Sequence, residues 1–208
     1  MGLQASITQS PRNANVYNVL FDNVYFTGAG ASEAARQRYI DVTRSSMSGT
    51  FIPAGITVNT SVNVVNRPVE GGITVKILPG NVLGNGDNGI VRSAPGDFQS
   101  LVMTIPAGGR SDTIPHENFH MLCPSCAYAG HGIQGSGIMN SSSAPESRVI
   151  TSQPFLEAYR NAGTGSLPGV RQDASPFGDF GFGGGASGGF LLYPNKPNNN
   201  QMIGVYRK

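Results

Sequence analysis

Three segments between residues 56 and 105 alternate apolar and polar side chains with a period of two residues. They cover residues 56–64, 73–77 and 101–105, and the last is followed by Pro106. Successive side chains of a β-strand point to opposite faces of the sheet, so this period predicts strands with one buried face. Residues 15–26 also predict a strand or a hairpin. A chain with this pattern needs a sheet at its centre.

Three helices are expected around these strands. Ser32 can cap a helix that runs to about Ser46, with Ala35, Tyr39, Ile40 and Val42 on a buried face. Either Ser111 or Asp112 can cap a second helix, which must end near Cys123 because Pro124 follows. A third helix is expected from Ser152 to about Gly163. The predicted fold class is α+β with α/β character: a twisted mixed sheet with an early, a middle and a C-terminal helix.

The pattern of strands and helices stops near residue 162. The 208 residues suffice for one domain with its own core, expected at residues 1–162. Residues 163–208 form a Gly-rich C-terminal extension, with seven glycines between positions 178 and 189. Short strands are predicted at residues 190–193 and 202–206. We interpret the extension as a flexible linker with a short docking strand, or as a propeptide-like or partner-binding extension, with self-assembly or docking through it as the expected interaction.

Charge and hydropathy limit the partners. The net charge is +2 and no basic patch is present, so a nucleic-acid partner is not expected. No apolar run approaches the roughly 18 residues of a membrane span. Charged residues make up only 12%, about half the usual share, which favours an extracellular, surface or particle-associated protein. The N-terminus has no recognisable signal-peptide pattern. A structural subunit of a capsid or filament is the alternative.

One pentapeptide indicates metal chemistry. Residues 116–120, His-Glu-Asn-Phe-His, match the pattern H-E-x-x-H within the second predicted helix. Side chains four residues apart lie on one helix face, so His116 and His120 can bind one Zn²⁺ ion. Glu117 can then take a proton from the zinc-bound water as the catalytic base. The alternative interpretation is a capped helix with solvent-facing polar residues.

A third ligand and a methionine follow the pentapeptide. His131 is the remaining histidine of the chain, and Met139 lies eight residues beyond it in Ile-Met-Asn. Residues 15–162 here resemble the metzincins, the metalloprotease clan that includes matrixins and astacins. That clan has H-E-x-x-H-x-x-G-x-x-H followed by a methionine turn. The resemblance implies a zinc endopeptidase with His131 as third ligand and Met139 in the turn.

The chain departs from this pattern at two cysteines. Cys123 and Cys126 stand where the clan has glycine and histidine, and His131 comes five residues late. The interpretation we favour is an insertion that delivers His131 by a longer loop. Two others stay open: Cys126 replaces the third histidine, or both cysteines complete a closed structural site with the two helical histidines. The cysteines could also form a local disulfide or both be free.

The expected function is a zinc-dependent endopeptidase that hydrolyses peptide bonds of a peptide or protein substrate by means of water activated by Glu117. The resemblance places an extended substrate along the upper edge strand, expected at residues 100–105, by strand addition. The alternative is a structural or assembly protein of a virion, filament or surface, with a vestigial or structural zinc site on a metzincin-like scaffold.

Overall fold

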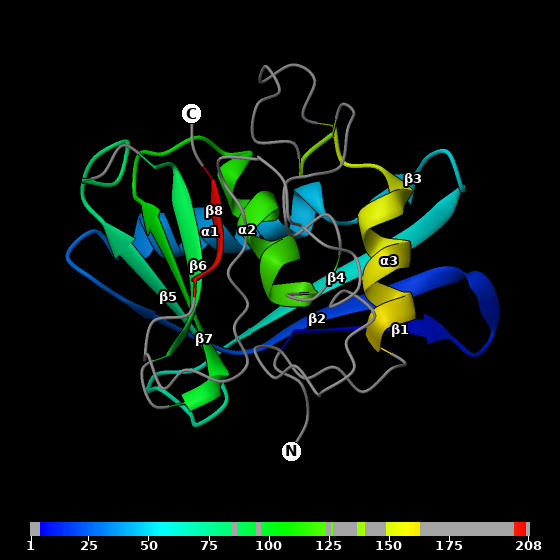
Figure 1. The fold of residues 1–208 in the computed structure, drawn as a ribbon, viewed down its shortest axis with the longest axis horizontal. Coiled ribbons are helices and arrows are strands. Elements are labelled where there is room, and N and C mark those ends of the chain that lie inside the picture. The colour runs from blue at the N-terminus through cyan, green and yellow to red at the C-terminus, as the bar shows by residue number, and fades with distance from the viewer. Residues whose placement is uncertain are drawn as a thin grey trace, which may run out of the picture.

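A long strand near the N-terminus, β2 (Asn13–Thr27), organises the sheet (Figure 1). The computed structural model describes residues 5–84, 87–94, 97–123, 126, 137–139, 149–162 and 202–206. β1 (Ala5–Ser10) folds back on β2 as an antiparallel hairpin. β4 (Ile56–Val64) pairs parallel with the middle of β2, and β5 (Ile73–Leu78) with its last residues. The hairpin or strand expected from residues 15–26 is therefore confirmed.

The sheet continues from β5 to the side that carries the C-terminal strand. β7 (Asp97–Pro106) pairs parallel with β5, and β6 (Gly89–Ala94) pairs antiparallel with β7. β8 (Met202–Tyr206) pairs antiparallel with β6. At the other side β3 (Gly49–Phe51) pairs antiparallel with β4. The order is β3-β4-β2-β5-β7-β6-β8, with β1 on β2, so the predicted mixed sheet is confirmed.

Three helices complete a mixed α/β fold. α1 (Glu33–Ser46) begins after Ser32, whose hydroxyl oxygen accepts a hydrogen bond from the Ala35 N–H at 3.2 Å, as expected for the cap. α1 packs against β4 and against α2 (Thr113–Leu122), while α3 (Ser152–Ala162) packs against β1. No helix in the described part of the chain is long and apolar enough to cross a membrane.

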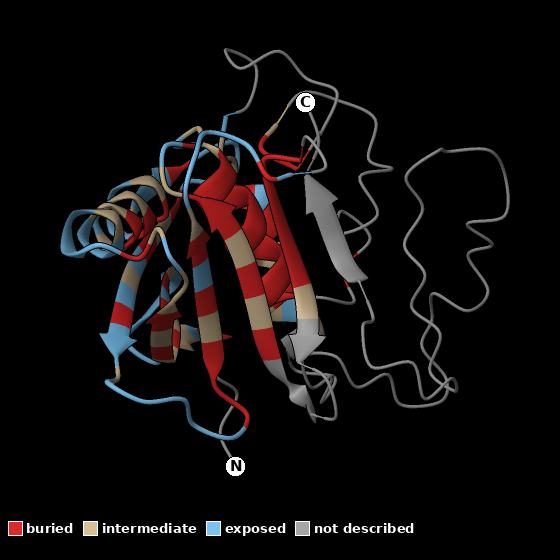
Figure 2. Cartoon of the chain, turned by 90° about the vertical axis from the view of Figure 1, so that its left-hand side faces the viewer, coloured by how far each residue is buried: buried red, intermediate tan, exposed pale blue. Residues whose placement is uncertain are grey.

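The core follows the period of two on the central strands, as Figure 2 shows in red. The alternating apolar side chains of β5 and β7 are all buried, as predicted: Ile73, Val75, Ile77, Leu101, Met103 and Ile105. In β4 the prediction is wrong at Val64, which is 47% exposed. Val64 ends the strand beside the bulge in β2 between Phe21 and Val24, where a strand bends and regular packing stops.

One expectation about the edge of the sheet needs correction. The segment Ser100–Ile105 lies in β7 between β5 and β6, so it is not an edge strand. β6 lies outside β7, and the sequence did not predict β6 because it is short and follows directly on a turn-rich loop. The predicted strand at Met202–Tyr206 is confirmed, and it lies along the outer side of β6.

Candidate metal and catalytic site

Helix α2 carries the H-E-x-x-H residues and is buried along its whole length. Its first turn holds Pro115, whose missing N–H is not needed there. Asp112 occupies the N-cap position, but Arg110 binds both carboxylate oxygens, at 2.9 and 2.6 Å, so the side chain does not cap the helix. The N–H of Cys123 donates to the Phe119 carbonyl oxygen at 3.0 Å and closes the last turn. The interpretation as a helix with solvent-facing polar residues is wrong.

One face of α2 is fixed to α1 by a buried polar network. The Tyr39 hydroxyl donates to Oδ1 of Asn118 at 2.8 Å, and Nδ2 of Asn118 donates to the Thr43 hydroxyl oxygen at 2.9 Å. Burial raises the pKa of Tyr39 well above its usual range, so the phenol stays a hydrogen-bond donor. Asn118, at a variable position of the motif, therefore fixes how α2 sits on the fold.

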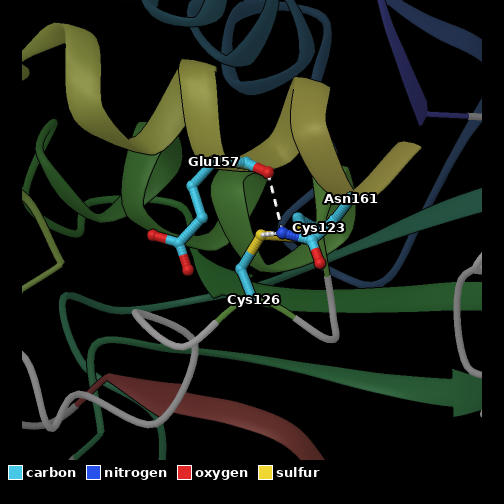
Figure 3. Close-up of a disulfide and its surroundings, with 4 residues drawn as sticks. All are labelled: Cys123, Cys126, Glu157 and Asn161. Carbon is cyan, nitrogen blue, oxygen red and sulfur yellow. Dashed lines mark hydrogen bonds between the residues drawn. A yellow bond between two sulfur atoms is a disulfide. The ribbon is translucent and has the colours of Figure 1, made fainter. Parts of the chain in front are cut away.

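The opposite side of α2 is held by α3 and by a disulfide (Figure 3). The Phe119 and Phe155 rings meet edge to face with centroids 4.9 Å apart. Cys123 and Cys126 form a disulfide directly after α2. Nδ2 of Asn161 donates to the Glu157 carbonyl oxygen at 2.8 Å and lies 3.5 Å from the Cys126 sulfur. The C-terminal end of α2 is thus tied to the C-terminal end of α3.

The two motif imidazoles face each other. Nε2 of His116 and Nε2 of His120 are 3.2 Å apart, and both side chains are fully buried. Nδ1 of His116 lies 2.7 Å from the Ile138 carbonyl oxygen, which can only accept, so Nδ1 carries the proton. The neutral His116 ring then has its lone pair on Nε2, directed at His120. An orienting bond of this kind is the usual partner of a metal-binding histidine.

This pair fits a zinc ion. Two nitrogen ligands at about 2.0–2.1 Å from a tetrahedral ion lie about 3.3–3.4 Å from each other, close to the separation found. No group of three or more His, Cys, Asp or Glu side chains that could hold a metal is present among the described residues. The predicted third ligand, His131, lies outside them. The structure therefore brings together two of the three predicted ligands.

The residue of the predicted methionine turn directly follows a residue that contacts this pair. Met139 is buried and directly follows Ile138, whose carbonyl oxygen orients His116. The N–H of Ile138 donates to the Val149 carbonyl oxygen at 3.1 Å, which fixes the segment just before α3. The Ile-Met stretch thus lies against the first motif histidine, although 22 residues separate Ile138 from it.

Glu117 projects from α2 towards β6. Its carboxyl group is fully buried, and neither oxygen has a hydrogen-bond partner within the described ranges. Burial, with a smaller contribution from the nearby Asp87 carboxylate, raises the pKa of Glu117 well above its ordinary value. A cation at the neighbouring imidazoles would favour the ionised carboxylate and offset this effect. The proposed metal would therefore explain why a buried carboxyl group without a described hydrogen-bond partner directly follows the first of two facing imidazoles.

Gly89 and Thr113 lie beside this carboxyl group, and the buried Asn88 directly precedes Gly89 in the chain. Gly89, the first residue of β6, is so close that a Cβ there would lie 2.7 Å from Oε1 of Glu117. Asn88 is buried, and its amide nitrogen and oxygen have no partner in the part of the chain that is described. The same holds for the hydroxyl of Thr113. Sequence reasoning missed all three: the only signal for Asn88 and Gly89 was the turn-rich composition around the start of β6, and Thr113 is an ordinary residue of the first turn of α2.

The cysteines are oxidised in this structure. With Cys123 and Cys126 joined to each other, neither sulfur is a thiolate, the form in which cysteine binds zinc. The two interpretations that used Cys123 or Cys126 as ligands therefore require a reduced protein. The local disulfide was one of the expected states of the pair.

A scan against models of known protein families finds no match for this chain, and a search of curated protein sequences finds none either. The interpretation of the site therefore depends on the chain's own motif, geometry and burial.

Proposed function

We propose that this protein is a zinc-dependent endopeptidase of metzincin-like design. The observation that carries the proposal is the His116–His120 pair, with Nε2 atoms 3.2 Å apart and with Nδ1 of His116 bound to a main-chain carbonyl oxygen. The fixed tautomer, the orphaned Glu117 carboxyl and the motif spacing together favour a shared metal.

Each residue of the site has a role in this proposal. His116, His120 and His131 would hold the zinc, which when bound polarises a carbonyl group and lowers the pKa of a water molecule. Glu117 takes the proton from the attacking water and delivers it to the leaving amine. Asn118 and the Ile138 carbonyl are positioning groups, because one sets the place of α2 and the other the orientation of the His116 ring.

The element order supports the metzincin-like design. An early helix, a largely parallel central sheet, the motif helix and a later helix follow one another as the resemblance implies. The Ile-Met segment beside His116 agrees with a methionine turn. The Cys123–Cys126 disulfide favours an oxidising environment, in line with an extracellular or particle-associated protein.

The test compares metal content and cleavage in matched variants. Wild-type protein at neutral pH should hold one zinc per chain and cleave casein or a peptide library. Glu117→Gln should keep the zinc and lose at least about 100-fold in rate. Glu70→Gln makes the same chemical change at an exposed loop position and should behave as wild type. Equal, metal-independent behaviour of all three proteins would reject the enzyme.

The burial of Glu117 favours one competing function. A carboxyl group with no exposed surface is compatible with a structural or assembly protein that keeps a vestigial or structural metal site. Under that function His120→Asn would lower stability or assembly, and Glu117→Gln would leave both unchanged or improved. Cleavage that depends on Glu117 separates the two functions.

A further inference from the structure

The outer side of β6, which faces away from β7, lies beside the proposed catalytic carboxyl group of Glu117. β6 is bonded to β7 on one side, and its other side takes an additional antiparallel strand. Gly89 at the start of β6 lies against Glu117, so a strand on this outer side runs past the carboxyl group. An exposed strand edge binds extended peptides through main-chain hydrogen bonds with little regard to sequence. Geometry therefore makes this edge the place for an extended polypeptide.

The chain itself supplies a strand there. In the pairing register Gly89 lies opposite Tyr206, Ile90 opposite Val205 and Val91 opposite Gly204. β8 also contacts α2, the helix that carries the motif. Figure 1 shows β8, drawn in red, alongside β6 at the end of the sheet next to α2.

We propose that Met202–Tyr206 occupies the outer edge of β6 as a built-in competitor of the extended peptide substrates that the metzincin resemblance places along such an edge. The proposal deepens the endopeptidase function and depends on it. It accounts for the complete burial of Glu117, because the edge beside that carboxyl is filled by the chain's own strand. It also assigns a function to residues 202–206: the protein that carries this strand is held in a low-activity form until the strand is displaced.

The size of the effect follows from tethering. A segment linked within the same chain acts at an effective concentration of about 1 mM. For a short strand with a dissociation constant of about 0.1 mM, the ratio of occupied to vacant edge would then be about ten. Releasing β8 should therefore raise cleavage of an external peptide by about ten-fold.

The first arm of the experiment measures the strand itself in the full-length protein. Gly204→Pro combined with Val205→Pro removes two adjacent N–H groups, one of which faces β6 whatever the pairing phase. The amides of β6 that point towards β8, every second one between Gly89 and Arg92, should then exchange with deuterium about ten-fold faster or more. A pair of prolines at Asn198 and Asn199, before the strand, is the matched control and should leave the exchange rate unchanged. Equal exchange in all three proteins would overturn the placement of β8, whatever the activity.

The second arm measures cleavage of an external fluorogenic peptide by the same zinc-loaded proteins. The β8 variant should be about ten-fold faster than wild type and than the control. A synthetic peptide of residues 199–208 should inhibit the β8 variant and restore slow exchange at β6, while the same peptide with both prolines should do neither. If the β8 variant exchanges its β6 amides faster but cleaves the peptide at the wild-type rate, the inhibitory role of β8 is refuted and the endopeptidase function is not. If the β8 variant exchanges its β6 amides faster but neither wild type nor variant cleaves the peptide, the endopeptidase function is refuted, and the competitor role of β8 with it.

Discussion

Replacement of Gly89 by alanine tests the contact between the edge strand and the proposed base. A Cβ at this position would lie 2.7 Å from Oε1 and 2.9 Å from Cγ of Glu117, and 2.8 Å from Cγ2 of Thr113. Ordinary van der Waals contact begins at 3.4 Å, so the carboxyl must move by about 0.5–1 Å. Because Glu117 is fully buried, that shift displaces its neighbours as well.

Overpacking of a buried site costs about 1–3 kcal/mol. Alanine recovers about 0.5–1 kcal/mol because it restricts the unfolded chain more than glycine does. We therefore expect Gly89→Ala to lower the free energy of unfolding by about 1–2 kcal/mol. The loss of activity should be much larger, about 100-fold, because a displacement near 1 Å takes the base out of its productive position.

Urea denaturation followed by circular dichroism gives the free energy of unfolding, and a fluorogenic peptide gives the cleavage rate. Gly84→Ala is the matched control, since a Cβ there meets nothing within 4 Å. It should change the free energy of unfolding by less than about 0.5 kcal/mol and leave cleavage unchanged. If Gly89→Ala retained both wild-type stability and wild-type cleavage, the close approach of β6 to Glu117 would be refuted.

Three other predictions concern the motif and its support. Tyr39→Phe leaves Oδ1 of Asn118 without its donor and should cost about 1–3 kcal/mol. Burial raises the pKa of Tyr39, so the free energy of unfolding of wild type should fall as the pH rises past 10.0, the pKa of an unfolded tyrosine. The variant lacks this group and should not show the loss. Parallel pH profiles of the two proteins in urea denaturation from pH 7 to 11 would contradict this expectation. The raised pKa of Glu117 implies that, in EDTA, wild type loses stability as the pH rises above 4.5, the ordinary pKa of a glutamate. Glu117→Gln should not share that loss. Equal slopes of the free energy of unfolding against pH for the two proteins between pH 4 and 8 would exclude this effect. Zinc at 100 times its dissociation constant should stabilise wild type by about 2.7 kcal/mol in thermal unfolding and His120→Asn far less; an equal shift in both would place the ion elsewhere.

Local signals in the sequence predicted most of the elements. Ser32 capped the first helix as expected, and the period of two placed β4, β5 and β7 correctly. These features depend on residues close together in the chain, which is why sequence reasoning reaches them. The motif spacing likewise brought His116 and His120 to one face of α2.

The rest depended on contacts between distant segments. Tyr39 and Asn118 are 79 residues apart, and the sequence around either residue does not indicate that the two form a hydrogen bond. The proximity of Gly89 to Glu117 arises only once β6 is added outside β7. The edge position itself was misassigned, because a strand's place in a sheet depends on which other strands pair beside it. His131, on which the third ligand depends, stays a prediction.

The hydrogen bond from His116 to residue 138 ends on a main-chain oxygen rather than on a side chain. Exchange of Ile138 for another residue leaves that acceptor in place, so point substitutions at this position cannot weaken the ring's anchor directly. Only a change in the course of the backbone can do so, for example by an inserted residue or by loss of the Ile138–Val149 hydrogen bond. Attempts to tune the proposed zinc site should therefore alter loop length here instead of side-chain identity.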